Sequence, residues 1–328
     1  MTQPVQADAS TFDDVVLPSR THVPLTRARS NVLLLLVALI WGSGFVAQAF
    51  AARHLGALTF NGLRFALGAA VVAPLAWREW RMLATRGRQP RPRDLAHIAG
   101  LGTLLFLGSA MQQAAMLTTT VTNAGFLTAL YIPLVPLLAW LASRQHPHWT
   151  TWAGAAGCVV GSWLLTGGGS LSALRTGDWW LIASSVPWAL HVMLVGRAAN
   201  QLHGALLVAC GQFVTCSVLS LLLGSSTEPL TGHGLAQALW PIAYSGVLSV
   251  GLGFTLQVVA QRHTRAADSA IVLSSETVFT AGFGALLMGD RLGASGLAGC
   301  ALILACVLMV QLQPIVWRWF ADTRARTA

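Results

Sequence analysis

The chain has no lysine and very few acidic residues. All 20 of its basic residues are arginine, Asp and Glu together number 11, and charged residues make up only 9% of 328 positions. Hydrophobic residues make up 55% of the chain and occur in long runs. A water-soluble domain carries roughly a quarter of its residues as charged side chains. This composition excludes an ordinary soluble domain and indicates a chain embedded in lipid.

Cysteine motifs and phosphate-binding loops are also lacking. The five cysteines fall inside apolar runs, and no two of them form a C-x-x-C pair. This spacing argues against disulfides and against a zinc site. The sequence contains no G-x-x-x-x-G-K-[ST] loop for a nucleotide. We therefore expect no metal and no cofactor.

A formal net charge of +9 is also typical of proteins that bind nucleic acids. The arginines, however, stand mostly in short gaps between apolar runs, where membrane topology places them, and they form no basic domain. We expect a lipid bilayer and a small-molecule substrate as partners, and no nucleic acid.

Ten apolar segments are long enough to cross a membrane. A helix needs about 20 mostly apolar residues to span a hydrocarbon core of about 30 Å. The predicted spans are 32–52, 57–77, 96–117, 121–142, 149–166, 179–195, 205–224, 238–260, 267–288 and 297–317.

The distribution of arginine supports this count. With ten spans and an inner N-terminus, 16 of the 20 arginines lie inside and three outside, with Arg64 within the second span. Fusing the third and fourth spans would move Arg262, Arg265 and the C-terminal arginines outside, whereas membrane proteins usually keep their basic residues on the cytoplasmic side. We expect a multi-pass protein of a bacterial-type inner membrane with both termini cytoplasmic. Residues 1–31 and 318–328 are predicted to be tails, the first of them disordered.

The sequence repeats itself with a period near 145 residues. Equivalent positions, 144 to 147 residues apart, are Trp41 and Trp188, Asn123 and Ala267, and Gly154 and Gly299. Each half, 32–168 and 177–317, holds five spans, and this odd number gives the second half the opposite orientation. The predicted fold is an all-α membrane protein of ten transmembrane helices in two inverted five-helix repeats. Inverted repeats are typical of carriers that work by alternating access, which we favour over a purely structural role.

Several motifs, taken in order, resemble those of the drug/metabolite transporter (DMT) superfamily, EamA-type permeases. The motifs are WGSGF at Trp41, LRFALGAA at Leu63, LTALYIPLVPLLAWL at Leu127, GDWWLIASSVPWALHVMLVGR at Gly177, YSGVLSVGLGFTLQVVA at Tyr244 and SETVFTAGFGALLMGDRLGASGLAG at Ser275. Thr277 stands where the family usually has proline, which loosens an expected kink, and Asp290 stands where Glu is usual. The resemblance implies a central cavity lined mainly by spans other than the fifth and tenth, and export of amino acids or related metabolites.

Ionisable side chains inside spans are costly and usually functional. Glu276 lies about 12 Å inside the ninth span, where it could carry a proton or bind a substrate amine. The alternative is a structural acid paired with Ser274 or Ser275. Arg64 could bind a substrate carboxylate bidentately or snorkel outward as an anchor. The resemblance places Arg here in many EamA halves, which favours an architectural role.

His191 shares a helical face with Trp188 and could titrate near neutrality, but we favour a buried neutral histidine bonded to a neighbour. Amides inside spans need partners and either join helices or line the cavity. We prefer three amides and three aromatic residues for the cavity, since a zwitterion or ring needs both kinds of surface. With no catalytic residue expected, the predicted substrate-binding residues are Trp41, Gln48, Arg64, Gln112, Tyr131, Trp188, His191, Gln257 and Glu276.

The favoured function is a secondary transporter, an exporter of amino acids or related metabolites, with protons as a candidate coupling ion. The alternative is an efflux carrier for drugs or lipophilic cations. A membrane enzyme is disfavoured because Glu276, Arg64 and His191 are scattered singly over three spans. Gly157 and Gly161 form a G-x-x-x-G motif that packs helices within a monomer or joins a homodimer.

Overall fold

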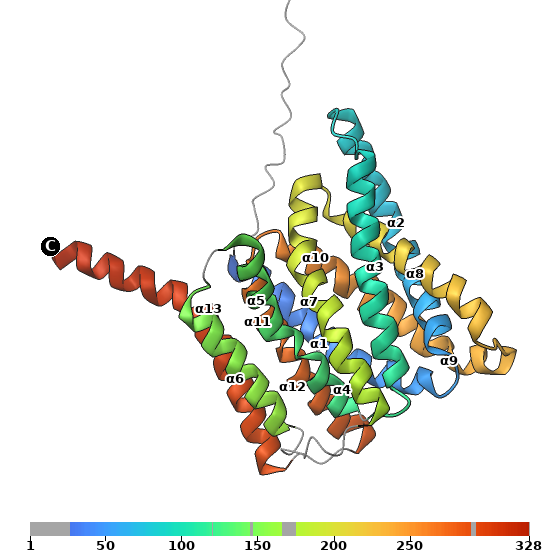
Figure 1. Ribbon diagram of the computed structural model, residues 1–328. Coiled ribbons are helices and arrows are strands. Elements are labelled where there is room, and N and C mark those ends of the chain that lie inside the picture. Colours follow the sequence, from blue (N-terminus) through green and yellow to red (C-terminus); the bar gives the residue numbers. More distant parts are fainter. Residues whose placement is uncertain (1–26, 120, 145–146, 166–174, 290–292, 328) are drawn as a thin grey trace, which may run out of the picture.

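The computed structural model describes residues 27–327, apart from position 120 and the segments 145–146, 166–174 and 290–292. The described residues are almost entirely helical and contain no strand (Figure 1). Eight helical segments have the length and apolarity of membrane spans. The 17-residue α6 and the apolar part of α13 are shorter. Together they account for the ten spans that the sequence predicts.

Each predicted span overlaps its helical segment over nearly its whole length. The segments are α1 (Arg27–Ala52), α2 (Ala57–Thr85), α3 (Pro92–Ala115), α4 and α5 (Val121–Thr128, Tyr131–Ser143), α6 (Trp149–Leu165), α7 (Thr176–Leu202), α8 (Ala205–Thr227), α9, η2 and α10 (Gly232–Tyr244, Ser245–Phe254, Thr255–Gln261), α11, α12 and η3 (Ala266–Leu273, Ser275–Phe283, Gly284–Met288), and α13 (Ala294–Thr327). Helix already begins at Arg27, inside the predicted N-terminal tail, and α13 continues past the predicted end at 317. Residues 1–26 and Asp290 lie outside the described residues.

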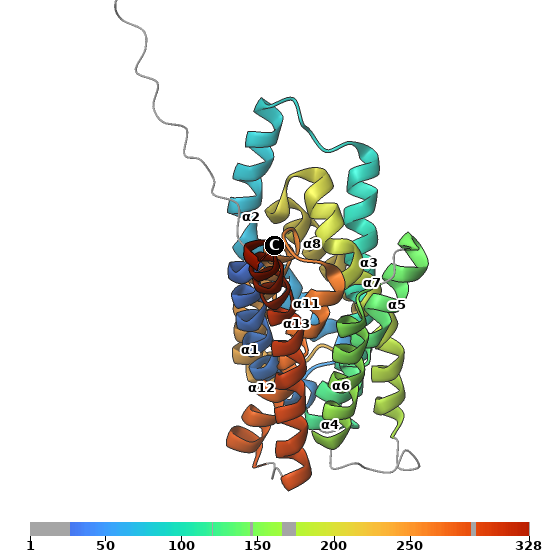
Figure 2. The same cartoon turned by 90° about the vertical axis from the view of Figure 1, so that its left-hand side faces the viewer.

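The two halves, α1–α6 and α7–α13, run in opposite directions. We call the end of the bundle that holds the α2–α3 connection the arginine-rich end, after Arg86, Arg88, Arg91 and Arg93. In Figure 1, α1 runs away from this end and α7 runs toward it. Figure 2 shows the α2–α3 connection projecting beyond the neighbouring helices, and α6 beside α13. The chain is thus an inverted repeat, as its odd number of spans per half requires.

Helix contacts come in pairs that the inversion exchanges. α3 packs on α7, and correspondingly α1 packs on η2 and α10, which form part of the third span of the second half. α1 packs on α11 and α12, and correspondingly α7 packs on α4 and α5. The contacts of α2 with α8, and of α6 with α13, pair equivalent helices directly. The first and third spans of the two halves therefore meet at the centre of the molecule.

Two glutamates cap each other's helices across the α2–α8 pair. Near the end of α2, Glu79 accepts a hydrogen bond from the backbone N–H of Leu207 in the first turn of α8, at 2.7 Å. Just after α8, Glu228 accepts hydrogen bonds from the N–H groups of Leu58 and Thr59 in the first turn of α2, at 2.9 and 2.8 Å. A carboxylate satisfies these free N–H groups and interacts favourably with the helix dipole. The two caps repeat the pseudo-two-fold relation of the halves.

The fourth span of each half is interrupted near its middle. Ala129 and Leu130 separate α4 from α5, and Ser274 separates α11 from α12. Leu130 and Ser274 are 144 residues apart, which is the offset of the sequence repeat here. The second break is present although residue 277 is threonine and not proline, and the Thr277 hydroxyl donates to the Ser274 carbonyl at 2.8 Å. Broken helices at depth typically surround the substrate site of a transporter.

Glycines mark the closest helix contacts. A Cβ atom at Gly161 would lie 2.8 Å from a backbone oxygen of α13, and one at Gly157 would also collide with α13. The G-x-x-x-G motif therefore packs α6 on α13 within the monomer. A Cβ atom at Gly42 would lie 2.9 Å from the backbone nitrogen of Thr280, so that α1 and α12 nearly touch.

Candidate functional site

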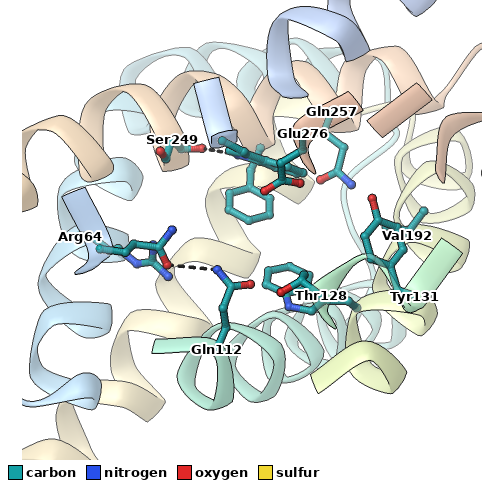
Figure 3. A pocket seen from close by; sticks show the side chains of 12 residues that line it. Arg64, Gln112, Thr128, Tyr131, Val192, Ser249, Gln257 and Glu276 are labelled. Atoms are coloured by element: carbon teal, nitrogen blue, oxygen red, sulfur yellow. Dashed lines mark hydrogen bonds between the residues drawn. The ribbon is translucent and has the colours of Figure 1, made fainter. Parts of the chain in front are cut away.

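A cavity lies between the two halves, and each half supplies six of its lining residues. The first half supplies Trp41, Gln48, Arg64, Gln112, Thr128 and Tyr131, and the second supplies Trp188, Val192, Ser249, Phe254, Gln257 and Glu276 (Figure 3). Eight of the nine residues predicted from the sequence are among them. α6 and α13 supply none, as the family resemblance implies.

Three stacked rings form what we call the aromatic wall: Trp41, Phe254 and Trp188. The Phe254 ring lies between the indoles, 4.5 Å from Trp41 and 6.0 Å from Trp188, and is stacked on the latter at an angle of 10°. The Trp41 indole N–H donates to the Ser249 carbonyl at 3.1 Å. Ser249 and Phe254 both belong to η2, a π-helix of ten residues. Such π-helical turns are rare and often occur at functional sites.

Arg64 is held at the cavity by its neighbour on α2. Its Nε and Nη2 atoms both donate to the Asn61 side-chain oxygen, at 3.1 and 2.9 Å. The Asn61 amide nitrogen donates in turn to the hydroxyls of Ser109 and Ser220, at 2.9 and 3.0 Å. Arg64 is 4% exposed, and no acidic side chain pairs with it among the described residues. It therefore does not snorkel, and its positive charge is free to meet an anion in the cavity.

Glu276 follows directly after the break in the ninth span. Neither Ser274 nor Ser275 bonds its carboxylate, and the described chain provides no other hydrogen-bond or ion-pair partner. Figure 3 shows Glu276 across the cavity from Arg64, and the two groups form no direct salt bridge. The cavity thus presents a cation on one side and an anion on the other.

The amides of the cavity differ in how they are bonded. The Gln112 amide nitrogen donates to the Gln48 side-chain oxygen at 3.1 Å, and the neighbouring Gln113 donates to the Gln48 carbonyl at 3.0 Å. Gln257, by contrast, has no partner for either its nitrogen or its oxygen, although it is only 1% exposed. One pair of amides joins α1 to α3, and Gln257 stands alone.

His191 is the one predicted site residue that does not line the cavity. Its Nε2 atom is hydrogen-bonded to the Gln212 side-chain oxygen at 2.8 Å, and the ring is fully buried. It meets Trp188 and Phe254 edge-on, with ring centroids 6.1 and 6.2 Å apart. His191 therefore packs against the aromatic wall from outside the cavity, in keeping with the core role that the sequence analysis favours.

Sequence reasoning missed four lining residues. Thr128 and Val192 are ordinary apolar-span residues, and Val192 stands four residues after Trp188, which also lines the cavity. Phe254 and Ser249 are placed by the π-helix, and the sequence gives no signal of that helix. A search one helical turn beyond Trp188 would have found Val192.

A second, larger hollow opens at the arginine-rich end, and we call it the vestibule. It lies among α5, α7, α10 and α11, and its lining residues include Arg197, Gln261, Arg265 and Asp268. Val192 lines both the vestibule and the central cavity. Its backbone carbonyl accepts a hydrogen bond from Gln261 at 3.2 Å. The two hollows are therefore separated by little more than the Val192 region of α7.

An ion cluster closes α1 onto α11 beside the vestibule. The buried Asp268 carboxylate accepts from Arg27 at 2.9 Å and from Arg265 at 2.9 and 3.2 Å. At the opposite end, Asp178 at the start of α7 accepts from the Thr119 hydroxyl, just before α4, at 2.6 Å. The α1–α11 and α7–α4 contacts are equivalent under the inversion. Each end of the bundle is thus held by one buried aspartate.

The described residues contain no cluster of three or more His, Cys, Asp or Glu that could hold a metal ion.

Known proteins of similar sequence include transporters. The chain is 25% identical to an uncharacterized transporter of Archaeoglobus fulgidus over 88% of this chain and 87% of the other. It is 28% identical to the threonine/homoserine exporter RhtA of Salmonella typhimurium, over 85% of this chain and 92% of RhtA. A solved crystal structure matches its fold with a TM-score of 0.69 at 18% identity, over 88% of this chain and 99% of that one.

The EamA-like transporter family matches the chain twice, once in each half. The matches cover residues 28–167 and 175–312, which together form most of the chain. With ten spans, inverted halves and a central cavity, the chain belongs to the EamA-like transporter family of the drug/metabolite transporter superfamily.

Proposed function

We propose that this chain exports amino acids or related small metabolites by alternating access. The observation that carries the proposal is the pairing of Arg64 and Glu276 on opposite sides of one cavity, neither with a partner of opposite charge among the described residues. A zwitterion would place its carboxylate at Arg64 and its ammonium at Glu276. Buried charges are costly unless paired, so such a substrate satisfies both. The printed function of RhtA, a threonine/homoserine exporter, supports this class of cargo.

The inverted halves supply the means of movement. We take 32–168 and 177–317 as the two repeats, a division supported by family matches at 28–167 and 175–312. Rocking one repeat against the other exposes the cavity alternately at each end. The vestibule serves as the entrance from the arginine-rich end, with Val192 between it and the cavity.

The arginine-rich end is proposed to face the cytoplasm of a bacterial-type inner membrane. The connection between α2 and α3 carries Arg86, Arg88, Arg91 and Arg93, and cytoplasmic loops are enriched in such residues. Ten spans place both termini on this side. Reporter fusions at each terminus would test the orientation, because a fluorescent protein that folds only in the cytoplasm should be bright at both.

Proton coupling is proposed to act through Glu276. Its carboxylate is the acid that lines the cavity, and it is free of ion pairs among the described residues. A proton and a substrate ammonium would compete for it, which links the entry of one to the departure of the other.

Efflux of lipophilic cations is the second candidate, because the aromatic wall and Glu276 together suit a cation. Arg64 on the same cavity repels a bare cation but attracts the carboxylate of an amino acid. Arg64→Gln should therefore weaken amino acid transport and leave or improve cation transport. Resistance of an overexpressing strain to lipophilic cations, measured for both forms, separates the two functions.

Liposomes that contain the purified protein test the main proposal. They should release preloaded labelled amino acids faster than protein-free liposomes, and Arg64→Gln and Glu276→Gln should each slow this release. Loss of one charge-assisted hydrogen bond, worth about 1.5–3 kcal/mol, weakens substrate binding about tenfold or more. A release rate equal to that of protein-free liposomes across a broad panel of amino acids and related metabolites would overturn the proposal.

A further inference from the structure

Two pairs of equivalent side chains line the central cavity. Trp41 and Trp188 are 147 residues apart, and Gln112 and Gln257 are 145 residues apart, so each pair joins one position of the first half to its counterpart in the second. All four side chains face the same space. Within one cavity, the hydrogen bonding of an indole and of an amide from the first half can therefore be compared with that of its equivalent from the second half.

In both pairs, the member from the first half is bonded within the protein and its counterpart is not. The Trp41 N–H donates to a backbone carbonyl at 3.1 Å, and the Gln112 amide donates to Gln48 at 3.1 Å. The Trp188 N–H and both polar atoms of the Gln257 amide have no partner. Buried polar groups are almost always hydrogen-bonded. Unpaired groups that face a cavity are thus available to whatever fills it.

The two residues with unpaired groups line the cavity from neighbouring helices. Trp188 stands one turn before Val192 on α7, and Gln257 stands one turn before Gln261 on α10. The Gln261 amide donates to the Val192 carbonyl at 3.2 Å and fixes the two helices together. Figure 3 shows the Gln257 amide near Glu276 and Tyr131, away from Arg64. A polar group held by Gln257 would therefore lie near the substrate ammonium rather than the carboxylate.

We propose that Gln257 recognises an uncharged polar side chain on the transported amino acid, namely a hydroxyl or a carboxamide. This proposal rests on the amino-acid cargo proposed above and adds the selection among amino acids. An amide offers both a donor and an acceptor, which a hydroxyl or carboxamide can match and a hydrocarbon cannot. A side chain without such a group would leave the buried amide unpaired, and sites of this kind reject the apolar analogue.

Threonine and valine provide the test, because they have nearly the same shape and threonine has a hydroxyl where valine has a methyl group. Proteoliposomes of the full chain should transport labelled threonine about tenfold or more faster than valine at equal concentration. Gln257→Met, which keeps the length of the side chain, should lower the threonine-to-valine ratio about tenfold, mainly through loss of threonine transport. Gln257→Asn keeps an amide with shorter reach and should retain part of the preference.

Gln112→Met is the matched control, because Gln112 is the equivalent amide but already has a partner. It should slow threonine and valine alike and leave their ratio within about twofold of the wild type. A second readout is the thermal unfolding midpoint in detergent, which threonine should raise in the wild type but not in Gln257→Met. The proposal is overturned if Gln257→Met folds and keeps the wild-type ratio, or if the wild type prefers valine. Absence of transport of every amino acid would instead overturn the cargo itself, and this selection with it.

Discussion

Glu79 and Glu228 occupy equivalent places in the two halves and have equivalent roles, since each lies near the C-terminal end of one helix of the α2–α8 pair and caps the first turn of the other. Gln112 and Gln257 also occupy equivalent places, but one is bonded and the other is not. The first pair lies at the ends of the bundle and the second at the cavity. The two halves therefore have matching contacts where these hold helices together, and different contacts at the cavity where a substrate would bind.

The strongest break in the symmetry is Glu276, whose equivalent in the first half is the buried Ile132, 144 residues earlier. Glu276→Gln removes the charge and keeps the shape. We expect transport driven by an imposed pH gradient to be lost, because a carboxamide cannot carry a proton, while exchange of substrate for substrate continues at a reduced rate. Proteoliposome assays with and without the gradient separate the two.

Glu228→Gln is the control for this change, because Glu228 is an acid outside the cavity lining. It should keep pH-driven transport at the wild-type rate. If Glu276→Gln does so too, Glu276 is structural and the halves do not differ in proton coupling.

The charged and amide residues that distinguish the halves at the cavity could be predicted from the sequence, because polar side chains are conspicuous within apolar runs and are costly to bury in a membrane. Glu276, Arg64 and the cavity amides are of this kind. The bonding state of the amides could not be predicted, because Gln112 is paired by Gln48 on another helix. The sequence left His191 between a core role and the cavity for a related reason. Helical spacing places His191 on the same face as Trp188, but its ring is hydrogen-bonded to Gln212 and lies in the core.

The fold was easier to predict than the site, since hydropathy and arginine placement report the spans directly. The π-helix of the eighth span was missed, because its ten residues are as apolar as those of an ordinary span. The interruption at Ser274 was underestimated, because the proline that would signal a kink is absent from position 277. In the structure, the Thr277 hydroxyl donates to the Ser274 carbonyl. Buried aspartates at the helix ends, such as Asp268, were also missed because they stand in short polar connections.

Gly42 offers a second way to test the comparison, because its equivalent in the second half is Ala189, 147 residues later. A Cβ atom at Gly42 would lie 2.6 Å from the Phe279 Cβ atom and 2.9 Å from the Thr280 nitrogen. Gly42→Ala, which copies the second half into the first, should cost about 1–3 kcal/mol through overpacking. The midpoint temperature of thermal unfolding in detergent and the transport rate should both fall.

Gly282→Ala on α12 is the matched control, since a Cβ atom there meets nothing within 4 Å. It should leave the unfolding midpoint unchanged or raise it slightly, because alanine favours helix over glycine. Equal midpoints for Gly42→Ala and Gly282→Ala would show that α1 and α12 do not need their close contact.

The buried aspartates at the two ends give a smaller contrast. Asp268→Asn weakens the cluster with Arg27 and Arg265 that closes α1 onto α11. We expect the arginine-rich end to open more often, by about fivefold if the lost ion pairing is worth about 1 kcal/mol. A cysteine introduced at Val192, with the native cysteines replaced, should then react faster with a membrane-impermeant maleimide applied from that end.

Asp178→Asn should have the opposite effect on the same probe, because it loosens the α7–α4 contact at the other end. Opening there disfavours opening at the arginine-rich end if access alternates. Faster labelling of the Val192→Cys probe in both variants would indicate general loosening of the bundle and not alternating access.

The smallest effects are expected where the halves agree. Glu79→Gln and Glu228→Gln each remove the charge that faces a helix N-terminus, and each should lower the free energy of unfolding by about 0.3–1 kcal/mol. The two caps lie at opposite ends of the α2–α8 pair and share no partner. Their effects in the double variant should therefore add within about 0.5 kcal/mol, as measured by denaturant unfolding in detergent. A cost confined to one glutamate would show that the symmetry of the contacts is not a symmetry of energies, and that the second half differs from the first even outside the cavity.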